Sequence, residues 1–289
     1  MLPARFDYLA PASLEETLGI LAERGEDAKV LAGGQSLIPL MKLRLARPAV
    51  LVDLANVPGL SGIEEDGSGL RIGAMTRNAA LVDSDLLRER YPAMATAAPL
   101  ISDPIIRNLG TIGGSLAHAD PAGDWGSVAL ALGAEVVARS AAGERTIPVS
   151  ELFTGTFETV LEPTELITEV RVPRPPGAAG GTYLKLERKV GDYATVAAAV
   201  QLEIANGAIG RAGIALTAVG ATNLRATAAE EALAGAAPSD EGFDEAARLA
   251  AEIADPYDDV RGSAEYKREV ARVFVRRGLA QALEIARGG

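Results

Sequence analysis

Residues 29–54 read KVLAGGQSLIPLMKLRLARPAVLVDL, and this stretch decides the fold class. Residues 29–31 predict a short strand that runs directly into a glycine pair. The leucine spacing over residues 37–45 then predicts a short helix, which tolerates Pro39 because it falls in the first turn. Residues 50–54 predict the next strand. This succession of strand, turn, helix and strand favours an α/β or α+β fold.

Elements on either side extend the same pattern. Upstream, Ser13 and Glu16 form a capping box ahead of a helix whose leucines share one face. Downstream, residues 78–89 predict a helix with Thr76 as its cap. Further strands are predicted at 70–74, 135–139, 145–149 and 166–172, the middle two as a hairpin. Residues 102–124 have neither a helical nor a strand period, and a loop this long inside a compact domain is usually functional.

The run PRPPGAAGG at residues 173–181 predicts a domain boundary, because proline and glycine break every pattern there. We therefore expect a first domain at 1–176 and a second at 177–289. In the second domain, Asn206-Gly207 is a strong type I′ hairpin signal. Strands are expected at 182–187, 195–204 and 208–219, and helices at 227–236, 240–254 and 264–286. The chain as a whole is expected to be α+β, ending in a three-stranded antiparallel sheet with a three-helix layer.

The composition excludes several classes of function. The chain has 289 residues and a formal net charge of −11, which makes attraction to nucleic acid or anionic lipid unfavourable. It contains no cysteine and one histidine, His118, so it cannot hold iron–sulfur clusters, cysteine zinc sites or paired-histidine metal motifs. The dinucleotide fingerprint G-x-G-x-x-G, the Walker A loop and the G-x-S-x-G elbow are also missing.

The sequence also bears on location. No stretch approaches the ~18 uninterrupted apolar residues of a membrane span, and the first residues show no leader pattern. We therefore expect a cytoplasmic protein with no transmembrane segment.

Two glycine pairs remain as candidate binding elements. They are Ala32-Gly33-Gly34-Gln35-Ser36 and Thr111-Ile112-Gly113-Gly114-Ser115. Glycine lets the backbone approach a ligand and turn its N–H groups toward one cluster of oxygens, and the neighbouring hydroxyl groups add donors without charge. Taken singly, a Gly-Gly pair is more often an ordinary turn. Both together make a shared phosphate-bearing ligand as plausible as two independent turns.

Four longer runs carry a resemblance to a known family. They are AGGQSLIPLMKLRLARP (32–48), RNLGTIGGSLAHADPAGDW (107–125), YLKLERKVGDYATV (183–196) and RGSAEYKREV (261–270). In this order they resemble the FAD-binding medium subunits of the molybdenum hydroxylases, the xanthine oxidase family. They are most similar to the aerobic carbon monoxide dehydrogenase branch, and the resemblance covers essentially the whole chain.

The resemblance implies a vanillyl-alcohol-oxidase-type (PCMH-type) FAD-binding domain of two α/β subdomains, followed by a C-terminal domain particular to the family. It implies a flavoprotein that takes electrons from two [2Fe–2S] clusters on a small subunit and passes them through FAD to an external acceptor, a quinone or similar. Substrate would be oxidised on a large molybdopterin subunit, and carbon monoxide, a purine and an N-heterocycle all remain open. The implied assembly is a dimer of heterotrimers, free in the cytoplasm or peripheral at the inner membrane face.

Carried over by position, the resemblance assigns FAD contacts to both glycine loops and to several positions beyond them. The contacts are Ala32, Gly33, Gly34, Gln35, Ser36, Leu37, Ile101, Thr111, Ile112, Gly113, Gly114, Ser115, Asp124, Ile167, Lys185 and Tyr193. Tyr193 is implied to stack on the isoalloxazine and Lys185 to contact the cofactor, so that both tune the flavin. No catalytic residue beyond the flavin and no metal ligand is implied.

Each of these last assignments has a structural alternative. Asp124 is also placed to be the N-cap of a helix at 125–132. Ile101 and Ile167 are equally suited to an ordinary core. Lys185 would otherwise be an exposed strand residue, and Tyr193 a hairpin aromatic that packs on the sheet.

Gln35 is a departure from the family, because several relatives carry histidine at this place. An amide cannot form a histidyl–flavin bond, so FAD is expected to be bound non-covalently, and His118 is expected to be an ordinary loop histidine. Partner docking is expected near the flavin edge and the basic cluster of Arg107, Arg188 and Lys189, with plain solvated charges as the alternative.

Two other functions stay open. The first is a self-contained FAD-dependent oxidase or reductase, for which Lys185, Glu187 and Tyr193 offer acid–base groups beside the ring. The second is a nucleotide-binding scaffold with no redox role.

Overall fold

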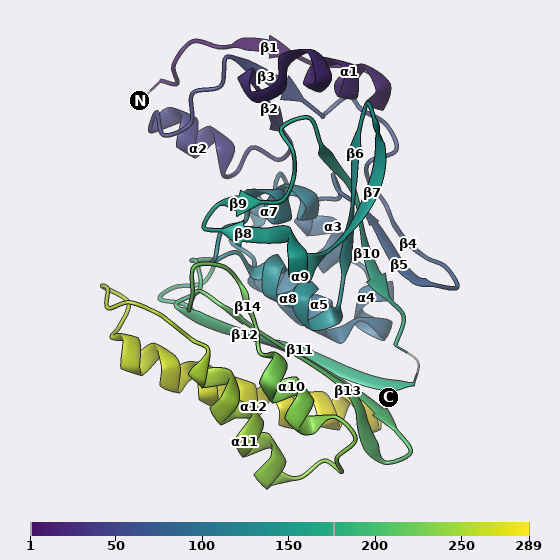
Figure 1. The fold of residues 1–289 in the computed structure, drawn as a ribbon, viewed down its shortest axis with the longest axis vertical. Coiled ribbons are helices and arrows are strands. Elements are labelled where there is room, and N and C mark those ends of the chain that lie inside the picture. The colour runs from purple at the N-terminus through teal and green to yellow at the C-terminus, as the bar shows by residue number, and fades with distance from the viewer. Residues whose placement is uncertain (1, 176, 289) are drawn as a thin grey trace.

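The computed structural model describes residues 2–175 and 177–288, so Pro176, the last residue of the first predicted domain, lies outside the described residues. Figure 1 shows three layers stacked along the long axis of the molecule. A small sheet with its helices lies at the N-terminal end, a five-stranded sheet with helices in the middle, and a four-stranded sheet with helices at the C-terminal end. No helix in the described part of the chain is long and apolar enough to cross a membrane.

The N-terminal layer is a parallel three-stranded sheet. Its strands, in sheet order, are β1 (Asp7–Leu9), β3 (Val50–Asp53) and β2 (Ala28–Leu31). Its helices are α1 (Leu14–Arg24), the 3₁₀ turn η1 (Gly25–Asp27) and α2 (Leu37–Lys42). The predicted cap of α1 is confirmed, because Ser13 accepts a hydrogen bond from the N–H of Glu16 at 3.1 Å. Since β2 and β3 are parallel, the segments that follow them leave the same edge of the sheet.

The middle layer is a five-stranded sheet with helices packed on one face. Its strands, in sheet order, are β4 (Ile63–Glu65), β5 (Gly69–Gly73), β10 (Leu166–Pro173), β6 (Glu135–Ser140) and β7 (Gly143–Pro148). Its helices are α3 (Asn78–Val82), α4 (Asp85–Arg90), α5 (Pro92–Ala97), η2 (Ala98–Leu100), α6 (Pro104–Arg107), α7 (Ile112–His118), α8 (Asp124–Leu132) and α9 (Val149–Leu152). A two-stranded ribbon follows, β8 (Phe153–Gly155) and β9 (Glu158–Thr159). Alternate sheet residues such as Ile72, Val136 and Val170 share one core with Trp125 of α8.

Several predictions for the middle layer were wrong. The single helix expected at 78–89 is two helices, because Ser84 caps α4 with its side chain and interrupts the first helix. Thr76 does not cap α3, since its hydroxyl exchanges two hydrogen bonds with the backbone of Gly62. Residues 102–124, expected to be irregular, contain α6 and α7, which have 4 and 7 residues. Helices this short leave no helical period in the sequence.

The C-terminal layer is an antiparallel sheet with three helices on its outer face. Its strands, in sheet order, are β11 (Ala178–Leu186), β12 (Val196–Ala205), β13 (Ala208–Thr217) and β14 (Leu224–Arg225). Its helices are α10 (Thr227–Leu233), α11 (Asp240–Glu252) and α12 (Ala264–Gly288). The predicted hairpin turn is confirmed, because Asn206 and Gly207 have positive φ angles of +54° and +79°.

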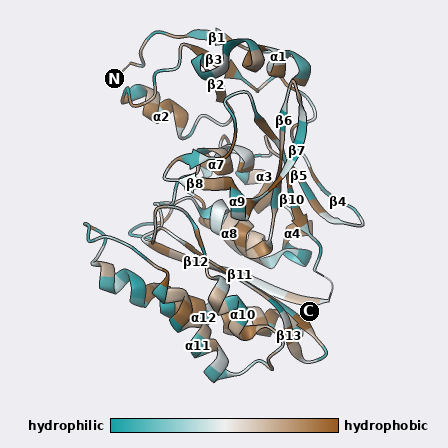
Figure 2. Ribbon diagram, viewed as in Figure 1, coloured by the Kyte–Doolittle hydropathy of each residue, from teal (hydrophilic) through white to brown (hydrophobic). Residues whose placement is uncertain are grey.

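Both faces of this C-terminal sheet are buried. Ala197 and Ala199 of β12 belong to the core of the middle layer, whereas Ala198 and Val200 belong to the core beneath α10, α11 and α12. α12 packs on β11 and β12 from one side, and α8 packs on β12 and β13 from the other. Figure 2 shows hydrophobic residues on the strands and on the helices that flank them. A strand buried on both faces has a continuous apolar sequence, as VAAAV in β12 does.

The C-terminal layer differs from its prediction in two respects. The sheet has four strands rather than three, because Leu224 and Arg225 pair with β13 over too few residues to leave a pattern in the sequence. β11 starts at Ala178, so part of the glycine-rich run expected to be irregular is strand. Gly180 is needed there because a Cβ would overlap the carbonyl oxygen of Ala282 in α12. This glycine therefore marks close packing of a helix on a strand.

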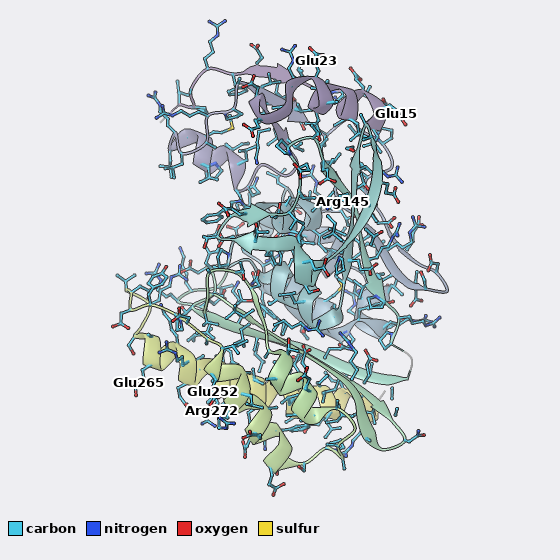
Figure 3. All side chains as sticks on the ribbon, viewed as in Figure 1. Glu15, Glu23, Arg145, Glu252, Glu265 and Arg272 are labelled. Atoms are coloured by element: carbon cyan, nitrogen blue, oxygen red, sulfur yellow. The ribbon has the colours of Figure 1, made fainter. Side chains whose placement is uncertain are left out.

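Charged side chains lie on the outside of the two end layers. Figure 3 labels Glu15 and Glu23 on α1, and Glu252, Glu265 and Arg272 on α11 and α12. Single ion pairs on such exposed helix surfaces add little stability.

Candidate cofactor site

The two glycine loops meet at the junction of the N-terminal and middle layers. The first loop leaves the end of β2, and the second forms the start of α7. A Cβ on Gly33 would overlap the carbonyl oxygen of Leu109, and a Cβ on Gly114 would lie 3.4 Å from the Cβ of Ala32. The structure therefore brings the two loops together, and the missing side chain at Gly33 allows this contact.

The first loop presents a row of free backbone N–H groups. Gly34 has a φ of +73°, a conformation that side-chain-bearing residues rarely adopt. Within residues 2–175 and 177–288, the N–H groups of residues 33–36 donate to no protein acceptor, while the side-chain amide of Gln35 donates to the carbonyl of Gly33 at 3.1 Å. Backbone N–H groups without protein partners are available to an anion such as a phosphate.

The second loop differs, because its N–H groups are already used. Those of Ile112 and Gly113 donate to the carbonyls of Thr76 and Ala74, at 3.2 and 2.9 Å. Those of Gly114 and Ser115 donate to the hydroxyl and the carbonyl of Thr111, at 3.2 and 3.0 Å. A Cβ on Gly113 would overlap Ala74, so this glycine lets α7 pack against the segment after β5. The second loop therefore supplies shape beside the first loop rather than a second set of free N–H donors.

Asp124 is the centre of a buried hydrogen-bond network. It is the first residue of α8 and not its N-cap, which is Gly123. Its Oδ1 accepts from the hydroxyl of Tyr183 at 2.6 Å, and its Oδ2 accepts from the Nζ of Lys185 at 3.1 Å. Burial raises the pKa of Asp124, although the positive charge of Lys185 and the hydroxyl of Tyr183 oppose that rise.

Lys185 is buried, so its alternative as an exposed strand residue is wrong. Its side chain is 1% exposed, and its Nζ also donates to the carbonyl of Leu100 at 2.9 Å. A second carboxylate, the Oε2 of Glu187, lies 3.6 Å from this ammonium group. Lys185 thus connects β11 to α8 and to the segment that leads into Ile101.

The network extends across the junction of the middle and C-terminal layers. The hydroxyls of Ser127 in α8 and Thr217 in β13 are 2.5 Å apart, and the Tyr183 hydroxyl lies 3.4 Å from Thr217. We call Asp124, Ser127, Tyr183, Lys185 and Thr217 the boundary network. Sequence analysis missed Tyr183, Ser127 and Thr217, although Tyr183 opens one of the four family-like runs.

Tyr193 lies at the end of the turn that connects β11 to β12. Its side chain is half-exposed, with 52% of its surface accessible. Burial and the negative charges of Asp120 and Asp124 raise the pKa of its hydroxyl. Gly191 lets this turn pack closely on the segment at Ser102. Its φ is +82°, and a Cβ added there would lie only 3.0 Å from the backbone of Ser102.

The remaining predicted positions lie in or near the middle layer. Ile167 is buried in β10, and Ile101 is partly buried against the same core. His118 stacks on Phe157 with 5.0 Å between the ring centroids, and burial lowers its pKa. The described part of the chain has no group of His, Asp and Glu side chains arranged to hold a metal ion.

Two of the three residues in the basic cluster proposed for docking, Arg107 and Arg188, already have partners within the chain. Arg107 donates to the carbonyl oxygens of Pro99, Ile101 and Ser102, at 3.1, 3.1 and 2.6 Å. Arg107 therefore holds the segment before α6 in place through these three hydrogen bonds. Arg188 pairs with Asp192 at 3.2 Å.

Two cavities lie beside the N-terminal layer. One, of about 380 Å³, is bounded by the segment after β3 and by Thr76 and Arg77. Arg77 bridges to Thr111 and donates to the carbonyl of Leu109, so this cavity adjoins the second glycine loop. Because β2 and β3 are parallel, the same sheet edge carries the first loop. Sequence analysis missed this cavity.

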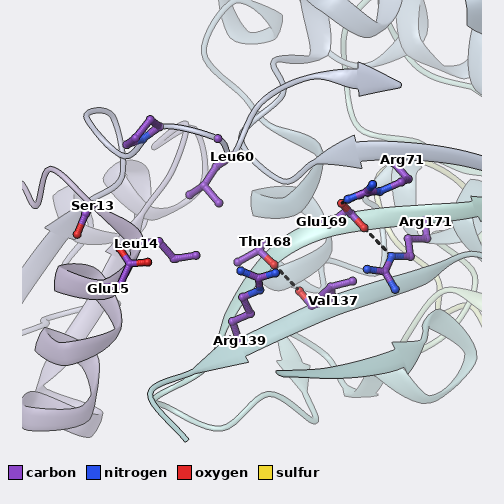
Figure 4. Close-up of a pocket in the computed structure, with 12 residues that line it drawn as sticks. Ser13, Leu14, Glu15, Leu60, Arg71, Val137, Arg139, Thr168, Glu169 and Arg171 are labelled. Carbon is purple, nitrogen blue, oxygen red and sulfur yellow. Dashed lines mark hydrogen bonds and ion pairs between the residues drawn. The ribbon is translucent and has the colours of Figure 1, made fainter. Parts of the chain in front are cut away.

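The other cavity, of about 410 Å³, lies between α1 and the open face of the five-stranded sheet (Figure 4). Three arginines line it, and two of them, Arg71 and Arg171, share the carboxylate of Glu169 at 2.6 and 2.5 Å. None of its lining residues comes from the glycine loops or the boundary network, so it is separate from the candidate site.

Comparison with known proteins gives the same picture for the whole chain. Residues 4–175 match the family described as FAD binding domain in molybdopterin dehydrogenase, and residues 181–282 match the CO dehydrogenase flavoprotein C-terminal domain. The carbon monoxide dehydrogenase medium chain of Afipia carboxidovorans is 44% identical over 98% of each chain. The 6-hydroxypseudooxynicotine dehydrogenase complex subunit alpha of Paenarthrobacter nicotinovorans is 43% identical over 99% of this chain and 97% of its own.

The fold of this chain also matches that of a known relative. A solved structure of carbon monoxide dehydrogenase from Hydrogenophaga pseudoflava superposes with a TM-score of 0.95, at 45% identity and over 99% of each chain. The two family matches together span nearly all of the sequence. The chain therefore belongs to the FAD-binding medium subunits of the molybdopterin dehydrogenases, and is an oxidoreductase subunit of the carbon monoxide dehydrogenase type.

Proposed function

We propose that this subunit takes electrons from [2Fe–2S] clusters on a small partner subunit and passes them through non-covalent FAD to an external acceptor such as a quinone. A large molybdopterin subunit oxidises carbon monoxide or a related small substrate, in a dimer of heterotrimers. The sequence supports the placement of the clusters on a partner subunit, because this chain has no cysteine and cannot hold the clusters itself. FAD, when bound, supplies the chemistry that accepts electrons from one partner and delivers them to another.

The row of free N–H groups at residues 33–36 is the observation that carries the site assignment. We place the FAD diphosphate against this row, with the hydroxyl of Ser36 beside it. The second loop closes the opposite side through the small surface of Gly114. The cavity beside Arg77 then offers room for another part of the same molecule.

The boundary network and the turn after β11 form the other wall of the proposed site. Tyr193 is half-exposed, and we assign its accessible surface to stacking on the isoalloxazine. Lys185 and Asp124 bond to each other and to Leu100 and Tyr183, so we assign them the role of holding α8 and the segment before Ile101 in place beside the ring. Gln35 is engaged with Gly33 and has no group that could bond covalently to flavin, which supports non-covalent binding.

The proposed domain boundary after residue 176 is supported by the two family matches, which end and begin on either side of it. The substrate is not set by this chain in the proposal. The medium chain of a carbon monoxide dehydrogenase and subunit alpha of a 6-hydroxypseudooxynicotine dehydrogenase complex resemble it almost equally, at 44% and 43% identity. Substrate choice is therefore assigned to the large subunit.

A pair of glycine variants tests the site. Gly34→Ala places a side chain at a φ of +73° and disturbs the row of N–H groups, so we expect FAD to bind about tenfold more weakly or worse. Gly59→Ala is the matched control, because Gly59 has a φ of +76° and no atom within 4 Å of its Cβ position. Flavin fluorescence titration of the purified chain measures both. Equal weakening in the two variants, or none in Gly34→Ala, would show that the first loop does not hold the diphosphate.

A further inference from the structure

The fourth family-like run, RGSAEYKREV, lies outside the glycine loops and the boundary network. It leads from the loop after α11 into α12, and its first residue is Arg261. The guanidinium group of Arg261 donates to the carbonyl oxygen of Tyr193 at 2.7 Å and to Asp192 Oδ1 at 3.0 Å. A residue 68 positions away in the sequence therefore holds the turn that carries Tyr193.

Asp192 completes this clamp. Its Oδ1 also accepts from the N–H of Tyr193 at 2.8 Å, and its Oδ2 accepts from Arg188 at 3.2 Å. Both backbone polar groups of Tyr193 are thus held, the N–H by Asp192 and the carbonyl by Arg261. The side chain of Tyr193, in contrast, makes no hydrogen bond to any residue that the structure describes. These hydrogen bonds therefore fix the backbone from which the ring projects.

Arg261 is itself fixed to α12. Its N–H donates to Asp259 at 2.8 Å, and Asp259 pairs with the buried ammonium group of Lys267 at 2.9 Å. Lys267 also donates to the carbonyl of Tyr257 at 2.8 Å. Ser263 accepts a hydrogen bond from the N–H of Tyr266 in the first turn of α12. These contacts hold the residues just before α12 in place against the start of that helix. The guanidinium group of Arg261 is thereby presented to the turn after β11.

We propose that Arg261 is a positioning residue that holds Tyr193 in the orientation needed to stack on the flavin. The inference rests on the proposed contact between Tyr193 and the isoalloxazine. Arginine suits the task because its planar group donates to a carboxylate and a carbonyl at a fixed spacing. The single nitrogen of a lysine side chain cannot donate to both the Tyr193 carbonyl and the Asp192 carboxylate in that geometry.

The test uses the full chain loaded with FAD, in the variants Arg261→Met, Arg261→Lys and Tyr193→Ala. A stacked tyrosine quenches flavin fluorescence and alters the visible absorption envelope. We expect Tyr193→Ala to raise the fluorescence, Arg261→Met to give at least half of that rise, and Arg261→Lys to fall between Arg261→Met and the parent. In the Tyr193→Ala background, Arg261→Met should add nothing further, because both changes act on the same contact.

Arg276→Met is the matched control. Arg276 lies on α12 and, like Arg261, pairs with acidic side chains, in its case Asp240 and Asp244 at 2.6 and 2.9 Å, but it contacts α11 instead of the turn. Its flavin fluorescence should equal that of the parent. If Arg261→Met is too unstable to load with FAD, the fluorescence of Arg261→Lys, which retains the positive charge, is compared with that of the parent and of Tyr193→Ala instead.

The possible failures are distinct. A rise in Tyr193→Ala without a rise in either Arg261 variant overturns the positioning role and leaves the proposed flavin contact intact. A rise from Arg261→Met that persists undiminished in the Tyr193→Ala background overturns it as well, since the effect would not pass through Tyr193. No change in Tyr193→Ala overturns both the positioning role and the contact on which it rests.

Discussion

Replacement of Lys185 by methionine should expose the energetic role of the buried ion pair. Methionine keeps the length of the side chain, so the change removes the charge and the donors without opening a large cavity. Two hydrogen bonds are lost, to Leu100 at 2.9 Å and to Asp124 at 3.1 Å. Lys185 and Asp124 are 1% and 8% exposed, so solvent cannot replace the missing partner.

The magnitude follows from two independent estimates. Removing one partner of a buried pair costs about 3–5 kcal/mol, because the other charge stays buried. Two hydrogen bonds that involve a charged group are worth about 1.5–3 kcal/mol each, which gives a similar total. We therefore expect Lys185→Met to lower the free energy of unfolding by about 3–5 kcal/mol at neutral pH.

The loss should depend on pH in a defined direction. Burial already raises the pKa of Asp124, and removal of Lys185 takes away the charge that opposes the rise. A group whose pKa is higher in the folded than in the unfolded state stabilises the fold at low pH, and that contribution is lost as pH rises through the folded-state pKa. The deficit of Lys185→Met should therefore be small in mild acid, where Asp124 holds a proton, and largest at neutral pH.

Urea unfolding of the FAD-free chain at several pH values measures this deficit without a contribution from ligand binding. In Asp124→Asn/Lys185→Met neither charge remains, so this double variant should lose less than the sum of the two single variants. Arg248→Met, which removes an exposed ion pair with Glu245, should leave stability nearly unchanged at every pH. A deficit in Lys185→Met below about 1 kcal/mol, or one that does not vary with pH, would contradict the buried ion pair.

Other predictions address the cofactor, the assembly and the packing. Tyr193→Ala should change the flavin absorption envelope and the rate of reoxidation by dioxygen, measured by stopped-flow absorbance, and an unchanged spectrum and rate would place the ring away from the flavin. The isolated FAD-loaded subunit should be bleached readily by dithionite and poorly by carbon monoxide, whereas fast bleaching by a small organic donor would favour a self-contained oxidase. Gly213→Ala should cost about 1–3 kcal/mol or more in urea unfolding, because its Cβ would overlap the carbonyl of Ala131 in α8. Gly210→Ala in the same strand meets nothing closer than 3.4 Å and should cost clearly less, so equal losses would contradict the close packing of β13 on α8.

The sequence predicted those elements whose signals are local. Ser13 and Glu16 marked the start of α1, and Asn206-Gly207 marked the hairpin between β12 and β13, because capping and turn chemistry depend on neighbouring residues. The long helices α11 and α12 were predicted for a similar reason, since 13 and 25 residues are enough to repeat an apolar period. The two-residue strand β14 and the short helix α6 have no such repeat and were missed.

Glycine shows why the candidate site could be predicted only in part. Gly33, Gly34 and Gly113 look alike in the sequence, yet the structure uses them differently. Gly34 adopts a positive φ, Gly33 allows contact with Leu109, and Gly113 allows α7 to pack on Ala74. Only the first of these uses is local. The other two depend on segments far away in the chain, and no spacing rule within a loop reveals them.

Under the proposed function, the boundary network connects cofactor binding to the docking of the two halves of the chain. Asp124 and Lys185 come from α8 and β11, on opposite sides of the junction, and both are proposed to hold the wall of the flavin site. The core at this junction includes Ala197 and Ala199 of β12 and Ala215 of β13, small side chains that let the sheet pack closely on α8 and leave little room for adjustment. A change that loosens the network should therefore weaken FAD binding before it unfolds either half. In this view Lys185→Met weakens FAD binding because it changes the spacing between α8 and Ile101. The weaker FAD binding should therefore largely persist at a pH where Asp124 is protonated, even though the loss of stability is small there.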